Sequence, residues 1–183
     1  ELGFLGLTFP ESDGGSNLSN RLWVQVVEEI ARISPSLSLL LNVQGGLAVK
    51  PIALLGNREQ KDRWLKPALA GRLIGAFGLT GPEAGSDAVN TTTTLRREGD
   101  RLLLNGEKTF ITQGGVADFI VVFARSDSLD GSGRRKVAAV IVEKGMAGFT
   151  VIKHDARKIG MHGTVTSTLK FEDAEIPETH VLG

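Results

Sequence analysis

Hydrophobic residues in the first part of the chain recur at three- and four-residue intervals, which is the period of an amphipathic helix. Leu22, Val26, Val27 and Ile30 share one face at this spacing, and Ser19 precedes them as a candidate N-cap. The pattern therefore predicts a helix that begins after Ser19 and turns one apolar face toward a core.

Two further helices are predicted in the amino-terminal part. The second follows Pro35, a residue suited to a first helical turn, and carries apolar residues as far as Leu47. Gly45-Gly46 weakens its middle by roughly 1 kcal/mol per glycine. Residues 57–60 form a capping-box pattern that starts a short third helix, which ends at Gly71. Three helices with few large aromatic residues cannot easily close a core, so we expect this part to pack on further helices or on another subunit.

From residue 73 onward the hydrophobic period changes to two. Eight short segments rich in Val, Ile, Thr and Phe are separated by Gly, Asn, Asp and Pro, which is typical of strands joined by turns. The predicted strands are residues 73–79, 88–96, 101–104, 108–112, 117–125, 136–143, 148–153 and 165–171. Asn105-Gly106 lies between two of them and favours a two-residue hairpin turn.

Strands without intervening helices indicate an antiparallel β-barrel or sandwich. Helices followed by strands predict an α+β fold. We therefore expect a helical domain over residues 1–72 and a β-barrel domain over residues 73–183.

Charge and composition narrow the possible functions. Lys plus Arg and Asp plus Glu each number 21, so the net charge is zero, which argues against a nucleic-acid partner. The lack of cysteine excludes disulfides, thiol catalysis and zinc–thiolate sites. No apolar run approaches the ~20 residues of a membrane span. His154, His162 and His180 are far apart in the sequence, so no metal site is predicted.

The first segment with candidate chemistry begins at Phe77 and contains glycines, a proline and the hydroxyls of Thr80 and Ser86. Such a loop exposes N–H groups and lets the polar edge of a ligand approach closely. It could equally be a tight strand connection in which Gly and Pro only supply backbone angles. It matches neither a Walker loop nor a dinucleotide fingerprint.

The second segment places Phe110 and Thr112 on the same strand face, just before Gly114-Gly115. An aromatic and a hydroxyl in this arrangement could stack on and hydrogen-bond a flat heteroaromatic ring. A core phenylalanine with an incidental threonine is the alternative.

Together the two segments resemble a known family. The pattern Leu-Thr-x-Pro-x-Ala-Gly-Ser-Asp at residues 79–87 resembles the first signature of acyl-CoA dehydrogenases. Asn-Gly-Glu-Lys-x-Phe-Ile-Thr-x-Gly-Gly at residues 105–115 resembles the second. Residues 142–149 and 158–177 resemble later barrel strands of that family, and residues 1–32 its amino-terminal helical domain. The resemblance covers essentially the whole chain and implies that the family's carboxy-terminal helical domain is absent, with both chain ends cut.

The resemblance implies FAD as the cofactor. Leu79 and Thr80 would lie near the pyrimidine edge of the ring, Gly85 and Ser86 near the pyrophosphate, and Ser86 would also contact the acyl-CoA. Thr112 would be in reach of the ring atom N5. The implied FAD-binding residues are Phe77, Gly78, Leu79, Thr80, Gly85, Ser86, Phe110, Ile111 and Thr112. Two departures stand out: Gly81 replaces a common glutamate, and Phe110 replaces a frequent tryptophan.

The implied reaction is α,β-dehydrogenation of an acyl-CoA thioester, in which a carboxylate removes the α-proton and N5 receives hydride. In the family the base is a glutamate of the carboxy-terminal domain, so no catalytic residue is assigned here. Glu83, Asp87 and Glu107 lie in solvated turns and are poor candidates for that base. This chain alone is expected to be inactive and to bind FAD weakly.

The resemblance also implies an electron-transfer flavoprotein as acceptor and a homotetrameric parent, in a bacterial cytoplasm or the mitochondrial matrix. Two other functions stay open on the same scaffold. One is a flavin oxidase or monooxygenase, in which the reduced flavin would react rapidly with oxygen. The other is a non-catalytic binding module.

Overall fold

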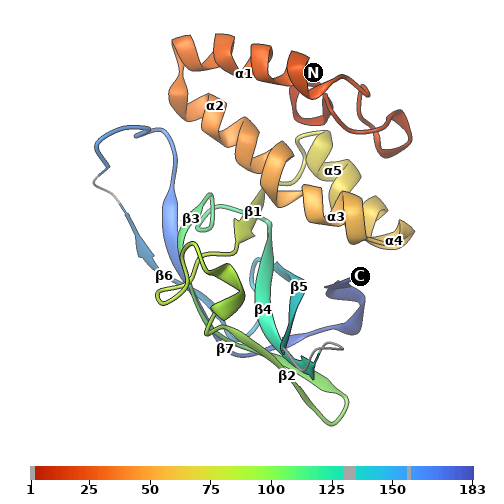
Figure 1. Cartoon of the computed structure of the whole chain (residues 1–183), viewed down its shortest axis with the longest axis vertical. Helices are drawn as coiled ribbons and strands as arrows, with labels where there is room; N and C mark the ends of the chain where they lie inside the picture. The colour runs from red at the N-terminus through yellow and green to blue at the C-terminus, as the bar shows by residue number, and fades with distance from the viewer. Residues whose placement is uncertain (1–2, 130–134, 156–157) are drawn as a thin grey trace.

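A layer of helices lies at one end of a bent eight-stranded sheet (Figure 1). The computed structural model describes residues 3–129, 135–155 and 158–183. This arrangement confirms the predicted α+β fold with helices first and strands second.

The helical layer is built from short α, π and 3-10 segments. They are η1 (Phe4–Gly6), η2 (Glu11–Asp13), α1 (Asn20–Ile33), α2 (Pro35–Leu41), η3 (Asn42–Ala48), α3 (Lys50–Leu55), α4 (Arg58–Gln60), η4 (Lys61–Leu65) and α5 (Lys66–Leu69). Ser19 caps α1 by accepting a hydrogen bond from the Leu22 N–H, as predicted. Asn57 and Gln60 form the predicted capping box, with both bonds at 2.9 Å.

The predicted second helix continues further than expected, because the π-helical segment η3 follows α2 directly and only Val49 separates it from α3. By length and composition alone, this 21-residue run from Pro35 to Leu55 could cross a membrane. On that criterion the expectation that no apolar run approaches the length of a membrane span is wrong. Val43, Ala48 and Ile52 of the run are buried, so packing within the protein accounts for part of its apolar character.

The strands form one sheet in the order β6-β7-β3-β2-β4-β5-β8, with β1 beside β4. They are β1 (Gly75–Gly78), β2 (Thr94–Glu98), β3 (Arg101–Thr112), β4 (Phe119–Leu129), β5 (Arg135–Glu143), β6 (Phe149–His154), β7 (Thr166–Ile176) and β8 (Val181–Leu182). The 3-10 turns η5 (Ala88–Asn90) and η6 (Glu178–His180) lie between strands.

Two of the strand pairings differ from the antiparallel expectation. β1 and β2 each run parallel to β4, while the other pairs are antiparallel. A parallel pair requires a long connection. β1 has one, since the chain passes through a loop, β2 and β3 before it returns as β4.

The predicted hairpin turn at Asn105-Gly106 is wrong. β3 runs through both residues, and a bulge shifts its register against β7 between Leu104 and Gly106. Gly106 is needed there because its φ is 130° and a Cβ would lie 2.7 Å from Thr93 Cα. The hairpin that joins β2 to β3 turns instead at residues 99–100, where Glu98 pairs with Arg101. The predicted strand at 88–96 begins only at Thr94, and β8 was missed.

Two apolar clusters share the central strands. Ile120 and Val122 of β4 belong to a cluster with β3 and β7, whereas Phe119 and Val121 face a second cluster with the helices. β4 and β5 are therefore buried on both faces, which explains their nearly continuous runs of apolar residues. Because β5 and β7 contribute to the same inner cluster, the sheet is bent around it.

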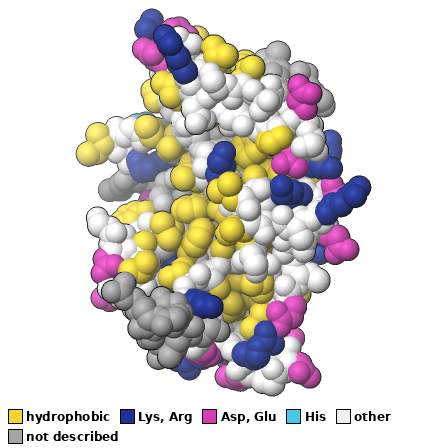
Figure 2. All heavy atoms as spheres, turned by 45° about the vertical axis from the view of Figure 1, so that its right-hand side comes forward, with side chains coloured by type: hydrophobic (Ala, Val, Ile, Leu, Met, Phe, Trp, Pro, Cys, Tyr) yellow, Lys and Arg dark blue, Asp and Glu magenta, His cyan; other side chains and the backbone are white. Residues whose placement is uncertain are grey.

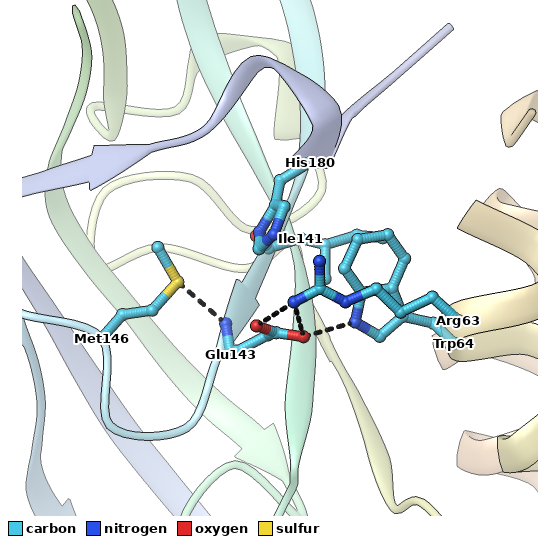
Figure 3. Close-up of polar contacts among 6 residues, drawn as sticks. All are labelled: Arg63, Trp64, Ile141, Glu143, Met146 and His180. Atoms are coloured by element: carbon cyan, nitrogen blue, oxygen red, sulfur yellow. Dashed lines mark hydrogen bonds and ion pairs between the residues drawn. The ribbon is translucent and has the colours of Figure 1, made fainter. Parts of the chain in front are cut away.

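A polar junction ties the helices to the sheet (Figure 3). Glu143 of β5 accepts hydrogen bonds from Arg63 at 2.8 and 2.9 Å and from Trp64 Nε1 at 2.8 Å. The Trp64 ring packs edge-on against His180 at 4.9 Å. Gln60 donates to the main-chain oxygens of Thr179 and Val181. These contacts fix the helical layer relative to the sheet.

Several apolar side chains of the helical layer remain exposed. None of the α1 residues is fully buried, and Leu54 and Leu55 of α3 are exposed. Hydrophobic side chains gather in the middle of the face shown in Figure 2. A shallow apolar pocket of about 340 Å³ lies between α3 and the strands β1 and β4, lined in part by Leu54, Phe77 and Phe123.

Candidate functional site

Gln44 holds the start of β1 against the helical layer. Its Oε1 accepts from the Gly75 N–H at 2.8 Å, and its Nε2 donates to Leu73 O at 2.8 Å and to Ala68 O at 3.2 Å. Gly75 has no room for a side chain, since a Cβ would lie 2.8 Å from the Phe119 ring. Sequence reasoning missed Gln44; a polar residue inside a largely apolar helical run was the available signal.

The structure brings the two predicted segments together. After β1 ends, the Thr80 carbonyl accepts a hydrogen bond from the Thr109 N–H at 3.0 Å. The preceding carbonyl, of Leu79, accepts from Lys108 Nζ at 2.8 Å. Two consecutive residues of the loop are therefore held by two consecutive residues of β3, next to Phe110 and Thr112.

The predicted polar groups lie at or near the surface. Thr80 and Thr112 are half-buried, and Gly85 and Ser86 are exposed. The Phe110 ring is 69% exposed. Gly85, Ser86 and Phe110 are thus accessible to a ligand on this loop and strand, and Thr80 and Thr112 are partly so.

Three other residues that were expected at the cofactor site are buried or lie in apolar surroundings. Ile111 has its side chain in the inner cluster of the sheet, so any contact from Ile111 to a ring would come from its main chain. Gly78 is buried, with Val122 so near that a Cβ would be 3.3 Å from it. Phe77 packs its ring at 5.1 Å from Phe123 and lines the apolar pocket beside α3.

A bulge turns Phe110 outward. The register of β3 against β7 shifts between Lys108 and Ile111, and Phe110 takes a φ of 58°. A bulky residue rarely adopts this left-handed conformation, and such strain concentrates at functional sites. Bulges near active sites serve to re-aim a side chain.

Gln113 adds a second unusual feature at the end of the same strand. Its φ is 66° and its side chain is buried. Its Oε1 is buried without a hydrogen-bond partner among the described residues. An unpaired buried acceptor is rare and points to a missing polar partner, such as a ligand or water.

Lys108 supplies the most unusual electrostatic feature of the site. Its side chain is completely buried, and burial lowers the pKa of Lys108 to about 8. Nζ donates to Leu79 O and, at 2.8 Å, to the hydroxyl of Thr91. Sequence reasoning did not single out Lys108, although a lysine inside an alternating strand pattern was visible.

The carboxylates near the loop do not form a buried base. Glu83 and Asp87 are exposed, and Asp87 accepts a hydrogen bond from the Asn90 amide. Glu107 is half-buried, and its main-chain oxygen accepts from the Thr93 hydroxyl at 3.0 Å.

The histidines are engaged in ordinary contacts. His154 Nδ1 lies 3.0 Å from Ser167 Oγ, and His162 and His180 bond to the main-chain oxygens of Lys158 and Ile141. Within residues 3–129, 135–155 and 158–183, no group of three His, Asp or Glu side chains is placed to hold a metal ion.

Known protein families account for both halves of the chain. Residues 1–72 match the family model described as "Acyl-CoA dehydrogenase, N-terminal domain", and residues 76–174 match "Acyl-CoA dehydrogenase, middle domain". The chain belongs to the acyl-CoA dehydrogenase family. The sequence resemblance carried by residues 79–87 and 105–115 is thereby confirmed.

Individual relatives agree with this assignment. An acyl-CoA dehydrogenase of Bacillus subtilis is 40% identical and matches 99% of this chain and 47% of its own length. A caffeyl-CoA reductase–Etf complex subunit of Acetobacterium woodii is 39% identical and matches 100% of this chain and 48% of its own length. The chain spans about half the length of the curated relatives it matches.

Solved structures of acyl-CoA dehydrogenases share the fold. Butyryl-CoA dehydrogenase of Megasphaera elsdenii has a TM-score of 0.91 at 37% identity, over 100% of this chain and 48% of that one. An acyl-CoA dehydrogenase of Bacillus anthracis, described as complexed with FAD, has a TM-score of 0.88 at 35% identity, over 100% of this chain and 31% of that one.

Proposed function

We propose that this acyl-CoA dehydrogenase family member takes part in FAD-dependent α,β-dehydrogenation of an acyl-CoA thioester. The observation that carries the proposal is the pairing of Thr80 with Thr109, which brings the signature loop and the signature strand onto one surface. Family membership supplies the reaction class, and the loop and strand supply the groups that this class requires.

The residues on this surface fit a flat cofactor with a charged tail. The half-buried Thr80 and Thr112 would donate from their hydroxyls to polar edges of the ring, and the exposed Phe110 would lie against it. Gly85 and Ser86 present main-chain and hydroxyl donors for the pyrophosphate, and Ser86 also for the thioester ligand. The unpaired oxygen of Gln113 is a further group in need of a polar partner.

FAD supplies the ring that accepts hydride from the β-carbon of the substrate. The contribution of this chain is to bind and orient that ring and to place fixed donors where negative charge gathers on reduction. Alignment of this kind accounts for a large share of catalysis in reactions with two reacting bonds.

Removal of the α-proton requires a carboxylate in an apolar pocket, where its pKa rises toward the working pH. Glu83 and Asp87 do not meet this condition because both are exposed. We therefore assign the base to a part of the protein outside these residues, and expect the 183-residue chain alone to be inactive.

The proposed partners follow from the same assignment. An acyl-CoA is the substrate, an electron-transfer flavoprotein is the acceptor, and the whole protein is a homotetramer. The name of the Acetobacterium woodii relative, a subunit of a complex with Etf, supports the acceptor.

The test uses the protein expressed from its complete gene and loaded with FAD. Anaerobic addition of a series of acyl-CoA thioesters should bleach the flavin absorbance. Thr112→Val should slow bleaching by about tenfold or more, because it removes one fixed donor, whereas Thr150→Val on β6 should not. Lack of bleaching with every chain length would refute the dehydrogenase, and rapid reoxidation by oxygen would favour an oxidase instead.

A further inference from the structure

Lys108 joins the two ends of the loop that carries Thr80, Gly85 and Ser86. The loop leaves β1 at Leu79, and its far end is Thr91, shortly before β2 begins. The Lys108 ammonium donates to Leu79 O and to Thr91 Oγ1, each at 2.8 Å. One nitrogen atom thus bridges both ends of the loop.

Packing alone does not explain a lysine at this position. The side chain is completely buried, and in the described part of the chain no carboxylate forms an ion pair with it. A buried cation without a counter-charge is costly, and an apolar side chain of similar length would avoid that cost. The lowered pKa of Lys108, at about 8, has this burial as its cause.

The neighbours of Lys108 on β3 reinforce both ends of the loop. The Thr109 N–H donates to Thr80 O at 3.0 Å, and the Thr93 hydroxyl donates to Glu107 O at 3.0 Å. Thr91 and Thr93 are completely buried. Three consecutive residues of β3 therefore hold the loop where it starts and where it ends, and its exposed middle is left free to meet a ligand.

We propose that Lys108 is a positioning residue for the flavin site, which holds Leu79 and Thr91 at a fixed separation and so orders the loop before FAD binds. A loop ordered in advance loses less conformational freedom on binding, which strengthens affinity. The identity of the ligand rests on the proposed function, whereas the ordering of the loop does not. Lys108 acts through Leu79 and Thr91.

The first experiment replaces the donor by an apolar side chain of similar length. Lys108→Met in the protein expressed from its complete gene should speed amide hydrogen exchange at residues 81–90 by about tenfold or more without FAD, because bonds to a charged donor are lost. The same variant should weaken FAD binding by about tenfold in an equilibrium titration. Lys153→Met is the matched control: its side chain is 67% exposed on β6, and both quantities should stay unchanged.

The second experiment removes only one acceptor and keeps the lysine. When Lys108 is present, Thr91→Val should speed amide hydrogen exchange at residues 81–90. Its effect should be smaller when Lys108→Met is already present, because the two changes break the same bridge. The Thr93 N–H bond to Thr91 Oγ1 is lost in both backgrounds and cancels in the comparison.

The outcomes separate the two proposals. If the wild-type protein does not bind FAD but Lys108→Met still loosens the loop, the proposed function fails and the positioning role stands. If FAD binds and neither exchange nor affinity responds to Lys108→Met, the positioning role is overturned. If Lys108→Met does not fold, Thr91→Val decides, and unchanged exchange at residues 81–90 overturns the proposal.

Discussion

At the scale of single residues, Phe110 combines strain with exposure. Its φ of 58° costs a residue with a side chain about 1–2 kcal/mol, and its ring gains little from burial because it is 69% exposed. Nothing in the folding of the chain alone accounts for an aromatic side chain here. The proposed contact of this ring with the flat cofactor would account for it, so substitution of Phe110 should change binding without a matching loss of stability.

Phe110→Gly is therefore expected to leave the protein as stable as before or to raise its free energy of unfolding by up to about 1 kcal/mol. FAD affinity should fall by roughly three- to tenfold, because ring stacking is lost. Urea unfolding and FAD titration measure the two effects. Ile111→Gly, at the buried neighbouring position, should instead cost about 3 kcal/mol of stability. A less stable Phe110→Gly protein with unchanged FAD affinity would contradict this account.

The buried charge of Lys108 makes stability depend on pH in an identifiable window. Burial lowers its pKa from 10.5 to about 8 in the folded protein, while the unfolded chain keeps the ordinary value. Below pH 8 both states hold the proton, so the full cost of burying the cation is present. Between about pH 8 and 10.5 only the unfolded state retains it, so the free energy of unfolding rises with pH, by about 3 kcal/mol in total.

Urea unfolding of the wild type and of Lys108→Met between pH 7 and 10.5 tests this window. As the pH rises, the free energy of unfolding of the wild type should increase relative to that of Lys108→Met. Lys153→Met should follow the wild type throughout. A constant difference across the window would show that Lys108 does not titrate in the folded protein as proposed.

At the scale of elements, the Asn-Gly dipeptide of β3 forms part of a bulge, although the same dipeptide also favours hairpin turns. Asn-Gly favours hairpins because glycine tolerates positive φ, but at Gly106 the same tolerance serves a bulge that passes close to Thr93. Gly99 also has a positive φ, 60°, but no atom lies within 4 Å of its Cβ position.

Gly106→Ala should consequently destabilise the protein by more than Gly99→Ala does. At Gly99 the cost is about 1 kcal/mol of backbone strain. At Gly106 a Cβ would also meet Thr93 Cα at 2.7 Å, so we expect about 3 kcal/mol or more. Urea unfolding of both variants gives the comparison, and equal losses would argue against the close approach at the bulge.

The elements that sequence predicted well are those specified by neighbouring residues. The Ser19 cap and the Asn57–Gln60 capping box depend on residues three apart. The strands β4 and β5 were predicted from their local runs of apolar residues. The two signature segments were found by resemblance, but no local pattern in either one shows that they touch. Gln44 and Lys108 escaped notice because their partners, Gly75 and Leu79, lie 31 and 29 residues away.

At the scale of the whole molecule, β4 and β5 form a wall shared by two apolar clusters. The sheet bends around the inner cluster, and the outer cluster attaches the helices. The exposed side of α3 is covered by neither cluster in the described residues, and Leu54 there is 72% exposed beside the shallow pocket that Phe77 and Phe123 also line. Exposed apolar surface of this kind marks contact sites between protein segments, and it agrees with the expectation that the helices need further support.

Self-association of the 183-residue chain should therefore depend on this surface and not on the core. Leu54→Gln combined with Leu55→Gln should reduce concentration-dependent association in sedimentation velocity. The free energy of unfolding should change by less than about 0.5 kcal/mol per substitution, because both side chains already meet solvent. Ile52→Gln, on the buried face of the same helix, should cost about 3 kcal/mol or more, because an amide is buried without a partner. A loss of stability in the Leu54 and Leu55 variant as large as that of Ile52→Gln would show that the outer face is packed within the chain and is not a contact surface.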